Sequence, residues 1–275
     1  MYQHACWEDL WTIWYTLVDD VYRVLEQHER AWRPSPPHPL CCYLHGSIAL
    51  GAFNLQLSDI DFITVVSRTC TPEDIARLRV IHQAIARQYP QWLLEGSYVQ
   101  WQGLGQLGDA RMPAPYHHDG MFHASSTFDA NAITWWVLKH QGIALRGPAT
   151  DALDFDVSWD ALVAEMAQNL NTYWASWARS PARIARLLTD DGVHWAVLGV
   201  LRKFYTFKEH ASTSKTGAGM YAQTQLPARW QRIVQEAINL RQQTGASMYR
   251  SRIFRARETV CFLRYIIRQC NAARF

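Results

Sequence analysis

The sequence of 275 residues predicts an α/β domain at residues 1–150 followed by an all-α domain of the helical-bundle type at residues 151–275. In the first half, three short apolar runs have the β-branched and aromatic content of strands. They are residues 41–44, 60–66 and 92–101. In the second half, apolar residues recur every three or four positions, which is the period of an amphipathic helix. The break at Gly147-Pro148 places the boundary between the two parts.

Helices are expected around these strands. Residues 7–32 carry apolar side chains at helical spacing, and the proline-rich stretch 34–39 would end that helix. A short helix is expected after the first strand. A longer one begins at Thr71-Pro72, where a capping residue precedes a proline at the first helical position and Asp74 follows three residues after the cap. This order of helices and strands is typical of an α/β domain.

Five later segments show helical periodicity, and they are 129–141, 157–177, 193–209, 228–243 and 247–269. Proline-containing breaks separate them at Gly147-Pro148, Ser180-Pro181 and Leu226-Pro227. Because no strand-like run interrupts the last four, we expect a bundle of helices.

Composition excludes several classes of protein. Hydrophobic residues make up 49% of the chain, so global disorder is excluded. No apolar run approaches the roughly 18–20 residues that cross a bilayer, and Glu8 and Asp9 stand where a signal peptide would be cationic. The six cysteines form no CxxC pair, which disfavours a zinc ribbon and a disulfide framework. We therefore expect a cytoplasmic protein that has no membrane partner.

Charge is unevenly distributed. Residues 1–148 carry a net charge of −4 and residues 149–275 a net charge of +7. A polyanion could bind against the second half. Solvated faces of helices explain the same excess equally well.

The chemistry-bearing residues gather between positions 43 and 66. Asp59 and Asp61 are two residues apart on an expected strand, so both carboxylates project from the same face. Paired carboxylates suit Mg²⁺, which is bound through one or two such groups together with substrate phosphates. Gly46-Ser47 lies between a strand and a short helix, where the backbone can approach a phosphate closely.

Glu95 supplies a third carboxylate, within the apolar run 92–101. If its strand neighbours that of Asp59 and Asp61, Glu95 could bind a metal or accept a proton from an attacking hydroxyl. Taken separately, Gly46-Ser47 is also typical of an ordinary turn, the Asp59/Asp61 pair of a solvated loop and Glu95 of an edge residue. Their joint spacing favours a site.

The pattern of Gly46-Ser47, ten residues and then Ser58-Asp59-Ile60-Asp61 resembles the signature of the polymerase-β-like nucleotidyltransferase superfamily. The resemblance extends along the chain to the aminoglycoside 3''-adenylyltransferases, which modify streptomycin and spectinomycin. Its further elements are Leu93-Leu94-Glu95, 142–148 (GIALRGP), 201–205 (LRKFY), Ser214-Lys215 and Leu226-Pro227. It implies a nucleotidyltransferase domain with a mixed sheet, followed by a helical domain, with ATP and drug between them.

Carried over to this chain, the resemblance implies Mg²⁺-dependent transfer of AMP from ATP to a hydroxyl of an aminoglycoside. It makes Asp59, Asp61 and Glu95 the metal ligands, and it makes Glu95 the general base as well. The residues implied near ATP are Gly46, Ser47, Ser58, Arg202 and Lys215. A guanidinium that forks onto phosphate oxygens and an ammonium that acts as a point charge are suited to this task.

The residues that would contact the drug match the family pattern less closely than those implied near ATP. The family places an aromatic contact between Glu95 and Gly142, and Phe122 or His123 could take that position. Asp190, Asp191 and His194 stand where the family has drug-binding polar residues, and as an alternative they cap the helix that carries Arg202. Substrate contacts are therefore assigned to Glu95, Phe122, Asp191 and His194. The histidines at 117, 118 and 123 lie in an expected loop without ligand spacing, which favours surface residues over a metal site.

Two other functions remain open. The acceptor could be an RNA or protein hydroxyl, because residues 251–275 contain six arginines and Glu258 as the single acidic residue. The lack of alternating exposed aromatics there makes nucleic acid an unlikely partner. The chain could also be a non-catalytic nucleotide-binding relative, although the retained carboxylates oppose this. By resemblance we expect a monomer.

Overall fold

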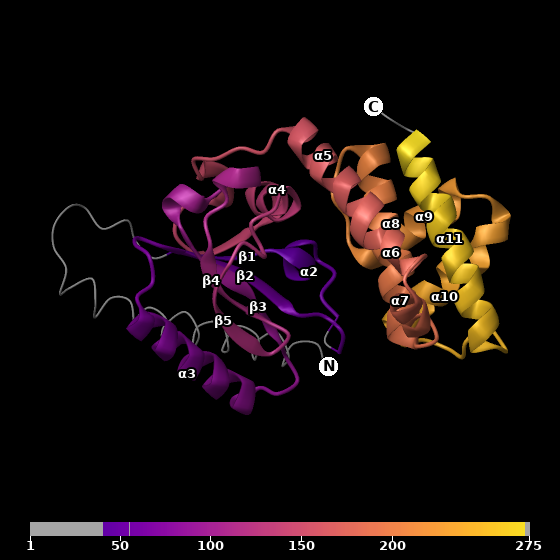
Figure 1. Ribbon diagram of the computed structural model, residues 1–275, viewed down its shortest axis with the longest axis horizontal. Helices are drawn as coiled ribbons and strands as arrows, with labels where there is room; N and C mark the ends of the chain where they lie inside the picture. Colours follow the sequence, from indigo (N-terminus) through magenta and orange to yellow (C-terminus); the bar gives the residue numbers. More distant parts are fainter. Residues whose placement is uncertain (1–40, 55, 273–275) are drawn as a thin grey trace. The chain divides into compact units, whose positions relative to one another are not determined.

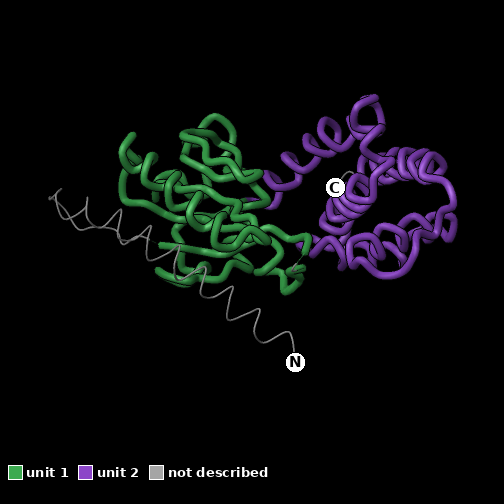
Figure 2. Tube along the Cα trace, turned by 90° about the horizontal axis from the view of Figure 1, so that it is seen from below, with its two compact units in different colours: residues 1–157 green, residues 158–275 purple. Residues whose placement is uncertain are grey.

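The computed structural model describes residues 41–54 and 56–272. The chain divides into two compact units, Met1–Val157 and Ser158–Phe275 (Figure 2). The expected helix at 7–32 and the proline-rich stretch after it lie outside the described residues.

The first unit is built on a six-stranded sheet with the strand order β5-β4-β3-β2-β1-β6. The strands are β1 (Cys41–Leu44), β2 (Ile60–Val66), β3 (Leu94–Gln100), β4 (Ala114–His118), β5 (Met121–Ser126) and β6 (Ile143–Arg146). β2 and β3 run parallel, whereas every other neighbouring pair is antiparallel. The sheet is therefore mixed, as expected, and β1, β2 and β3 fall on the three apolar runs.

Helices pack on both sides of this sheet, with α3 on one side and α4 on the other (Figure 1). The helices of the first unit are α2 (Gly46–Ala49), α3 (Pro72–Gln88), α4 (Ala132–Gln141) and the 3₁₀ turns η1 (Trp101–Gly103), η2 (Gly108–Ala110) and η3 (Thr150–Ala152). At the start of α3, Thr71 and Asp74 form the capping box that the sequence indicated.

The core of the first unit fixes which way each strand residue faces. Phe62 on β2 and Tyr98 on β3 pack in one buried cluster with Leu78 of α3. Because side chains alternate between the two faces of a sheet, Asp61 and Glu95 project from the opposite face. The apolar packing against α3 thus directs the acidic side chains away from the core.

The second unit is helical throughout its regular structure. Its elements are α5 (Trp159–Asn169), the π-helical turn η4 (Leu170–Trp174), α6 (Ala175–Trp177), α7 (Pro181–Arg186), α8 (Asp190–Glu209), α9 (Lys215–Gln225), η5 (Ala228–Trp230), α10 (Gln231–Gln242) and α11 (Arg252–Ala272). α8 is the central helix, since α9, α10 and α11 all pack against it. The expected bundle is present, and its interior is lined by the apolar side chains of α8.

Two details of the second unit differ from expectation. Lys215, which lies outside the expected helical segments, begins helix α9. Ser214 caps this helix by accepting a hydrogen bond from the Gly217 N–H at 2.9 Å. α8 begins at Asp190, not at Val193, because Thr189 provides its cap. Asp190, Asp191 and His194 therefore lie inside the helix.

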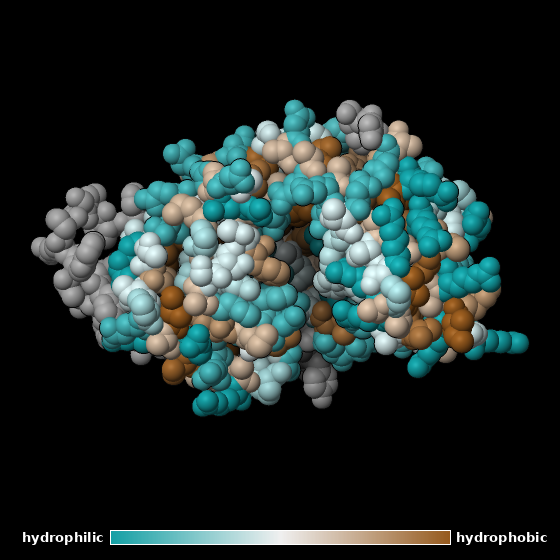
Figure 3. Space-filling model, in the orientation of Figure 1, coloured by the Kyte–Doolittle hydropathy of each residue, from teal (hydrophilic) through white to brown (hydrophobic). Residues whose placement is uncertain are grey.

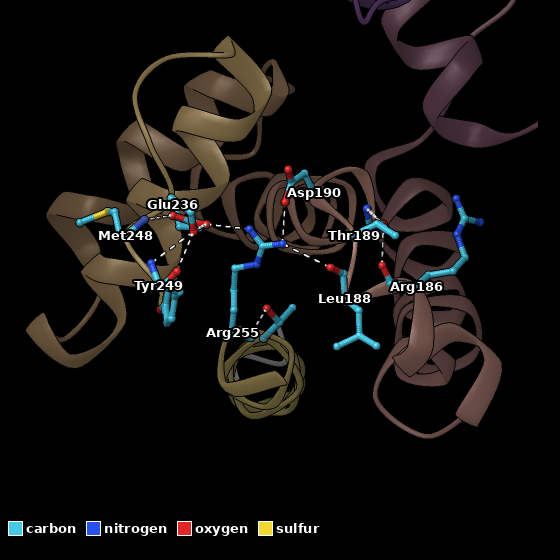
Figure 4. Close-up of polar contacts among 11 residues, drawn as sticks. Arg186, Leu188, Thr189, Asp190, Glu236, Met248, Tyr249 and Arg255 are labelled. Carbon is cyan, nitrogen blue, oxygen red and sulfur yellow. Dashed lines mark hydrogen bonds and ion pairs between the residues drawn. The ribbon is translucent and has the colours of Figure 1, made fainter. Parts of the chain in front are cut away.

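An ionic network, in which Arg255 and Glu236 are buried and Asp190 is exposed, ties three helices of the second unit together (Figure 4). The Arg255 side chain of α11 is 2% exposed and lies 2.9 Å from Glu236 Oε1 on α10 and 2.6 Å from Asp190 Oδ1 on α8. Glu236 also accepts hydrogen bonds from the Ser247 hydroxyl and the Met248 N–H. Because each charge has a partner, the network fixes the relative positions of α8, α10 and α11.

Hydrophilic residues cover most of the face shown in Figure 3, and hydrophobic residues form small separate groups on it. Ile253 and Phe254, at the start of α11, are 75% and 54% exposed. Within the described ranges, no helix combines the length and the apolar character needed to cross a membrane.

Candidate active site

The turn after β1 lies directly against a carboxylate. Gly46 adopts a φ of +60°, and a Cβ atom at this position would stand 1.9 Å from Asp61 Oδ2. Such a backbone conformation is readily available to glycine. The preceding His45 N–H donates a hydrogen bond to the Asp61 carbonyl oxygen at 3.1 Å. The glycine predicted from the sequence thus permits a close approach, and the group that it approaches is Asp61.

The structure brings the three predicted carboxylates to one place. Asp61 and Glu95 are direct neighbours in the parallel register of β2 and β3. Asp59 lies two residues before Asp61 in the chain, just ahead of the start of β2. Burial raises the pKa of Glu95, and the negative charge of Asp59 raises it further. Asp59 therefore acts on Glu95 through its charge, as a nearby like charge does.

The two predicted serines differ in their contacts. Ser58 is buried, and its hydroxyl accepts a hydrogen bond from the Asn54 N–H at 3.0 Å, which holds the loop before β2. The Ser47 hydroxyl is buried and has no hydrogen-bond partner within the described part of the chain. Ser47 therefore has donor and acceptor capacity to offer a ligand beside Gly46.

A hairpin formed by β4 and β5 supplies further groups that sequence reasoning did not place here. His118 Nδ1 lies 2.9 Å from Glu95 Oε1, and the Asp119 N–H donates a hydrogen bond to the same oxygen at 3.2 Å. Glu95 is thus held by the turn of the hairpin. The sequence signal was weak, because the pairing of β3 with β4 is a contact between residues far apart in the chain.

The expectation of loop histidines was wrong for His117 and His118, which belong to β4, and for His123, which belongs to β5. His117 is not at the surface. Its ring stacks on His82 at a centroid distance of 4.3 Å, and its Nδ1 lies 2.5 Å from the Leu94 carbonyl oxygen. Burial lowers the pKa of His117. This histidine belongs to the core beneath α3.

Phe122 and His123 lie on opposite faces of the sheet. Phe122 packs in the core, with its ring centroid 5.3 Å from that of His82, so the structure does not bring it to the carboxylates. His123 faces the carboxylate side, where its ring stacks on Tyr116 at 4.5 Å. Phe128 continues the stack at 5.5 Å from Tyr116 and is 48% exposed. Sequence reasoning missed Tyr116 and Phe128.

Beside the carboxylates lies a buried polar group that also escaped prediction. The Ser97 hydroxyl on β3 donates a hydrogen bond to Asp129 Oδ2 at 2.5 Å. Burial lowers the pKa of His45 to about 4, and the nearby Asp129 charge opposes this effect. Asp129 thus links the segment before α4 to the end of β1, next to Gly46.

The predicted ATP-binding residues of the second unit are both on helices. Arg202 on α8 donates a hydrogen bond from Nε to the Thr213 carbonyl oxygen at 3.1 Å. Lys215 opens α9, and its Nζ lies 4.1 Å from the centroid of the Trp195 ring. Such cation–π contacts are favourable where the cation is partly desolvated. Both cations are therefore held in defined positions.

Asp191 and His194, the predicted drug contacts of the second unit, are neighbours on α8. His194 Nε2 lies 3.4 Å from Asp191 Oδ1, and Arg186 lies 3.4 Å from the other oxygen of the same carboxylate. Burial lowers the pKa of His194 to about 4, so the imidazole is neutral at pH 7. Asp191 is exposed and can contact a cationic ligand.

Two arginines of the arginine-rich end of the chain make contacts within the bundle. Arg255 is buried in its ionic network, and Arg264 donates a hydrogen bond to the Ala178 carbonyl oxygen at 3.0 Å. Arg252, Arg257 and Arg268 are exposed on α11, so the alternative of an RNA acceptor stays open.

The donor set of the first unit fits Mg²⁺. Carboxylate oxygens are ligands that this ion takes, and Asp59 and Asp61 project them from one face beside the Gly46 turn. Burial, and then the negative charge of Asp59, raises the pKa of Glu95, and a bound cation would favour the charged carboxylate. Asp59 and Asp61, with Glu95 beside them, could therefore hold the metal.

This architecture, a mixed sheet followed by a helical unit, is the fold of a nucleotidyltransferase domain joined to a helical domain. The chain is similar to a crystal structure of spectinomycin adenyltransferase AAD(9) from Enterococcus faecialis with ATP and spectinomycin. The TM-score is 0.64 at 13% sequence identity, over 91% of this chain and 99% of that one. Comparison with family models and with curated protein sequences finds no match. The fold is thus aminoglycoside adenylyltransferase-like.

Proposed function

We propose that the protein transfers AMP from ATP to a hydroxyl group of an aminoglycoside of the streptomycin or spectinomycin type, with Mg²⁺ as cofactor, and so confers resistance. One observation carries this proposal. The carboxylate of Asp61 lies against the Gly46 turn while Glu95 neighbours it in register. In this proposal a phosphate-binding backbone, metal ligands and a proton acceptor would lie together at one end of the neighbouring strands β1, β2 and β3. The fold shared with an adenylyltransferase supports the same conclusion.

In this proposal each residue has a separate task. Gly46 and Ser47 hold the phosphates through backbone N–H groups and the unpartnered hydroxyl, while Asp59 and Asp61 hold Mg²⁺. When bound, the ion neutralises charge on the phosphates. Glu95 accepts the proton of the attacking hydroxyl, because its raised pKa makes the carboxylate a better base than an exposed one. The Asp119 N–H keeps Glu95 Oε1 in place.

The acceptor would lie along the aromatic face of the β4–β5 hairpin. Tyr116, His123 and Phe128 form a stacked series on the same face as Glu95. A cationic sugar ring can pack against such aromatic faces, and the adjacent carboxylates attract its charge. We assign the aromatic contact to this series and not to Phe122.

The roles of Arg202, Lys215, Asp191 and His194 stay predictions from the family resemblance. Arg202 and Lys215 are cations held in place, as phosphate contacts require. Asp191 is an exposed carboxylate, which suits a cationic drug. We further propose a cytoplasmic monomer. The five described cysteines form no disulfide with one another.

The test is to incubate the full chain with MgATP and a panel of aminoglycosides, and to measure pyrophosphate release and the mass of the product. We expect an increase in mass of one AMP unit on streptomycin or spectinomycin. If pyrophosphate were released with an RNA or protein acceptor but not with an aminoglycoside, the acceptor named in this proposal would be wrong. Binding of ATP without any transfer would favour the non-catalytic alternative.

A further inference from the structure

We propose that Glu95, His118 and Asp119 form a binding site for a transition-metal ion of the Zn²⁺ type. The three side chains each offer one ligand atom, and these atoms all lie within 4.8 Å of one another. The group shares Glu95 with the Mg²⁺ site proposed above but includes neither Asp59 nor Asp61. Its other two members come from the turn of the β4–β5 hairpin.

The separations between the groups can be compared with those of tetrahedral coordination. Zinc bonds of about 2.0–2.2 Å to nitrogen and oxygen place tetrahedral ligand atoms about 3.3–3.5 Å apart. In the structure, a nitrogen of His118 lies 2.9 Å from Glu95 Oε1, and the other ring nitrogen lies 3.4 Å from Asp119 Oδ2. The two carboxylates face different nitrogens of the ring, and one ligand atom from each of the three residues lies within 4.8 Å of the others, so a single ion would draw these atoms together.

His118 has an unused nitrogen at this place. Its Nδ1 is buried and makes no hydrogen bond of good geometry among the residues that the structure describes, and Glu95 Oε1 lies 2.9 Å from it. A buried imidazole nitrogen without a partner is costly unless something else satisfies it. A metal ion beside two carboxylates would do so.

The ligand types select the metal. An imidazole nitrogen with two carboxylates suits Zn²⁺ and its neighbours, whereas Mg²⁺ is bound by oxygen atoms. Three protein ligands with a further position open for water is a common arrangement for zinc. We therefore expect the hairpin site to bind Zn²⁺ in the presence of excess Mg²⁺.

Occupation of this site would affect the proposed reaction. This effect rests on the proposed function, whereas the binding of the ion does not. A carboxylate bound to Zn²⁺ cannot accept a proton from the acceptor hydroxyl. Since Glu95 belongs to both sites, occupation of the hairpin site should inhibit AMP transfer. The inhibition should be relieved when His118 is removed.

The test uses the full chain freed of metal with a chelator, in buffer that contains Mg²⁺ but neither ATP nor drug. Zn²⁺ binding is measured by titration calorimetry, and Co²⁺ is used as a coloured probe of tetrahedral coordination. We expect His118→Ala and Asp119→Asn to weaken binding by about tenfold or more. His123→Ala and Asp109→Asn are the matched controls and should bind as the parent chain does. Asp119 is exposed, so its variant should keep the fold even if His118→Ala disturbs β4.

Unchanged Zn²⁺ affinity in both His118→Ala and Asp119→Asn would overturn the inference. An equal loss in His123→Ala, or displacement of Zn²⁺ by millimolar Mg²⁺, would overturn it as well. Because the titration contains no substrate, its result does not depend on whether the protein transfers AMP. Conversely, AMP transfer without Zn²⁺ binding would leave the proposed function intact.

Discussion

The carboxylate of Asp61 occupies the space that any side chain at position 46 would need. Its Oδ2 would stand 1.9 Å from a Cβ atom there, much closer than atoms can approach. The glycine of the Gly46-Ser47 pair is therefore required by a neighbour on β2, and not by the turn alone. Gly51 has nearly the same backbone, with a φ of +62°, but has no atom near its own Cβ position.

Gly46→Ala and Gly51→Ala form a matched pair that separates backbone strain from displacement of Asp61. Each variant places an L residue in the left-handed region, at a cost of about 1–2 kcal/mol. Gly46→Ala must also move Asp61, so we expect AMP transfer to fall by about a hundredfold or more. Rates of pyrophosphate release and thermal unfolding would be measured for both. Equal rates in the two variants would contradict the role assigned to the turn.

Glu95→Gln should leave ATP binding intact while turnover falls by about 10²–10⁴-fold, which is the usual contribution of a positioned proton acceptor. The amide keeps the size of the side chain but cannot take the proton. Single-turnover kinetics and nucleotide titration would separate the two effects. Glu73→Gln, at an exposed position on α3, is the control and should be as active as the parent chain. Full turnover in Glu95→Gln would remove this residue from the mechanism.

Arg255→Met should destabilise the protein by about 3–5 kcal/mol, because it leaves the buried Glu236 carboxylate without its counter-ion. Arg257→Met lies on the same helix at an exposed position and should change the stability by less than about 0.5 kcal/mol. Urea denaturation followed by circular dichroism would measure both. Similar small losses in the two variants would mean that the network of Figure 4 adds little to stability.

Asp74 should make stability depend on pH at the acidic end. Burial alone would raise the pKa of Asp74, but hydrogen bonds from Arg68 and Thr71 outweigh burial and lower the pKa below 3.8. The folded state therefore holds this proton less tightly than the unfolded chain does. The stabilisation is present at neutral pH and is lost as the pH falls through the native pKa.

Asp74→Asn removes the charge and should cost about 2 kcal/mol at pH 7. The difference from the parent chain should narrow below about pH 4, where the carboxyl group of the unfolded chain becomes protonated. Chemical denaturation at several pH values measures this difference. A difference that stays constant down to pH 2 would show that the charge of Asp74 is not the cause.

The three carboxylates could be identified as candidates from the sequence because each is marked by a pattern of neighbouring residues. The alternation of side chains along a strand puts Asp59 and Asp61 on one face, and a single charge within an apolar run marks Glu95. Pairing of their strands follows once α3 is seen as the connection between them. The two-unit organisation could likewise be inferred from the change in periodicity.

The aromatic face could not be predicted in the same way. Tyr116 and Phe128 come together through the β4–β5 hairpin, whose strands mix histidine, serine and aromatic residues without clear alternation. Helix α9 was missed for a related reason. Its residues near Lys215 are mostly glycine, alanine and threonine, so they show no apolar stripe, and tertiary packing against α8 decides their conformation.

The parallel pairing of β2 with β3 has a consequence for how the protein acquires its site. Parallel strands cannot be joined by a tight turn, so Asp61 and Glu95 meet only after the chain has traversed α3 and returned. Bringing β2 and β3 together across so long a segment lowers the conformational entropy of the chain before any contact between the strands stabilises it. We expect substitutions that weaken α3 to slow the pairing of β2 with β3 during folding.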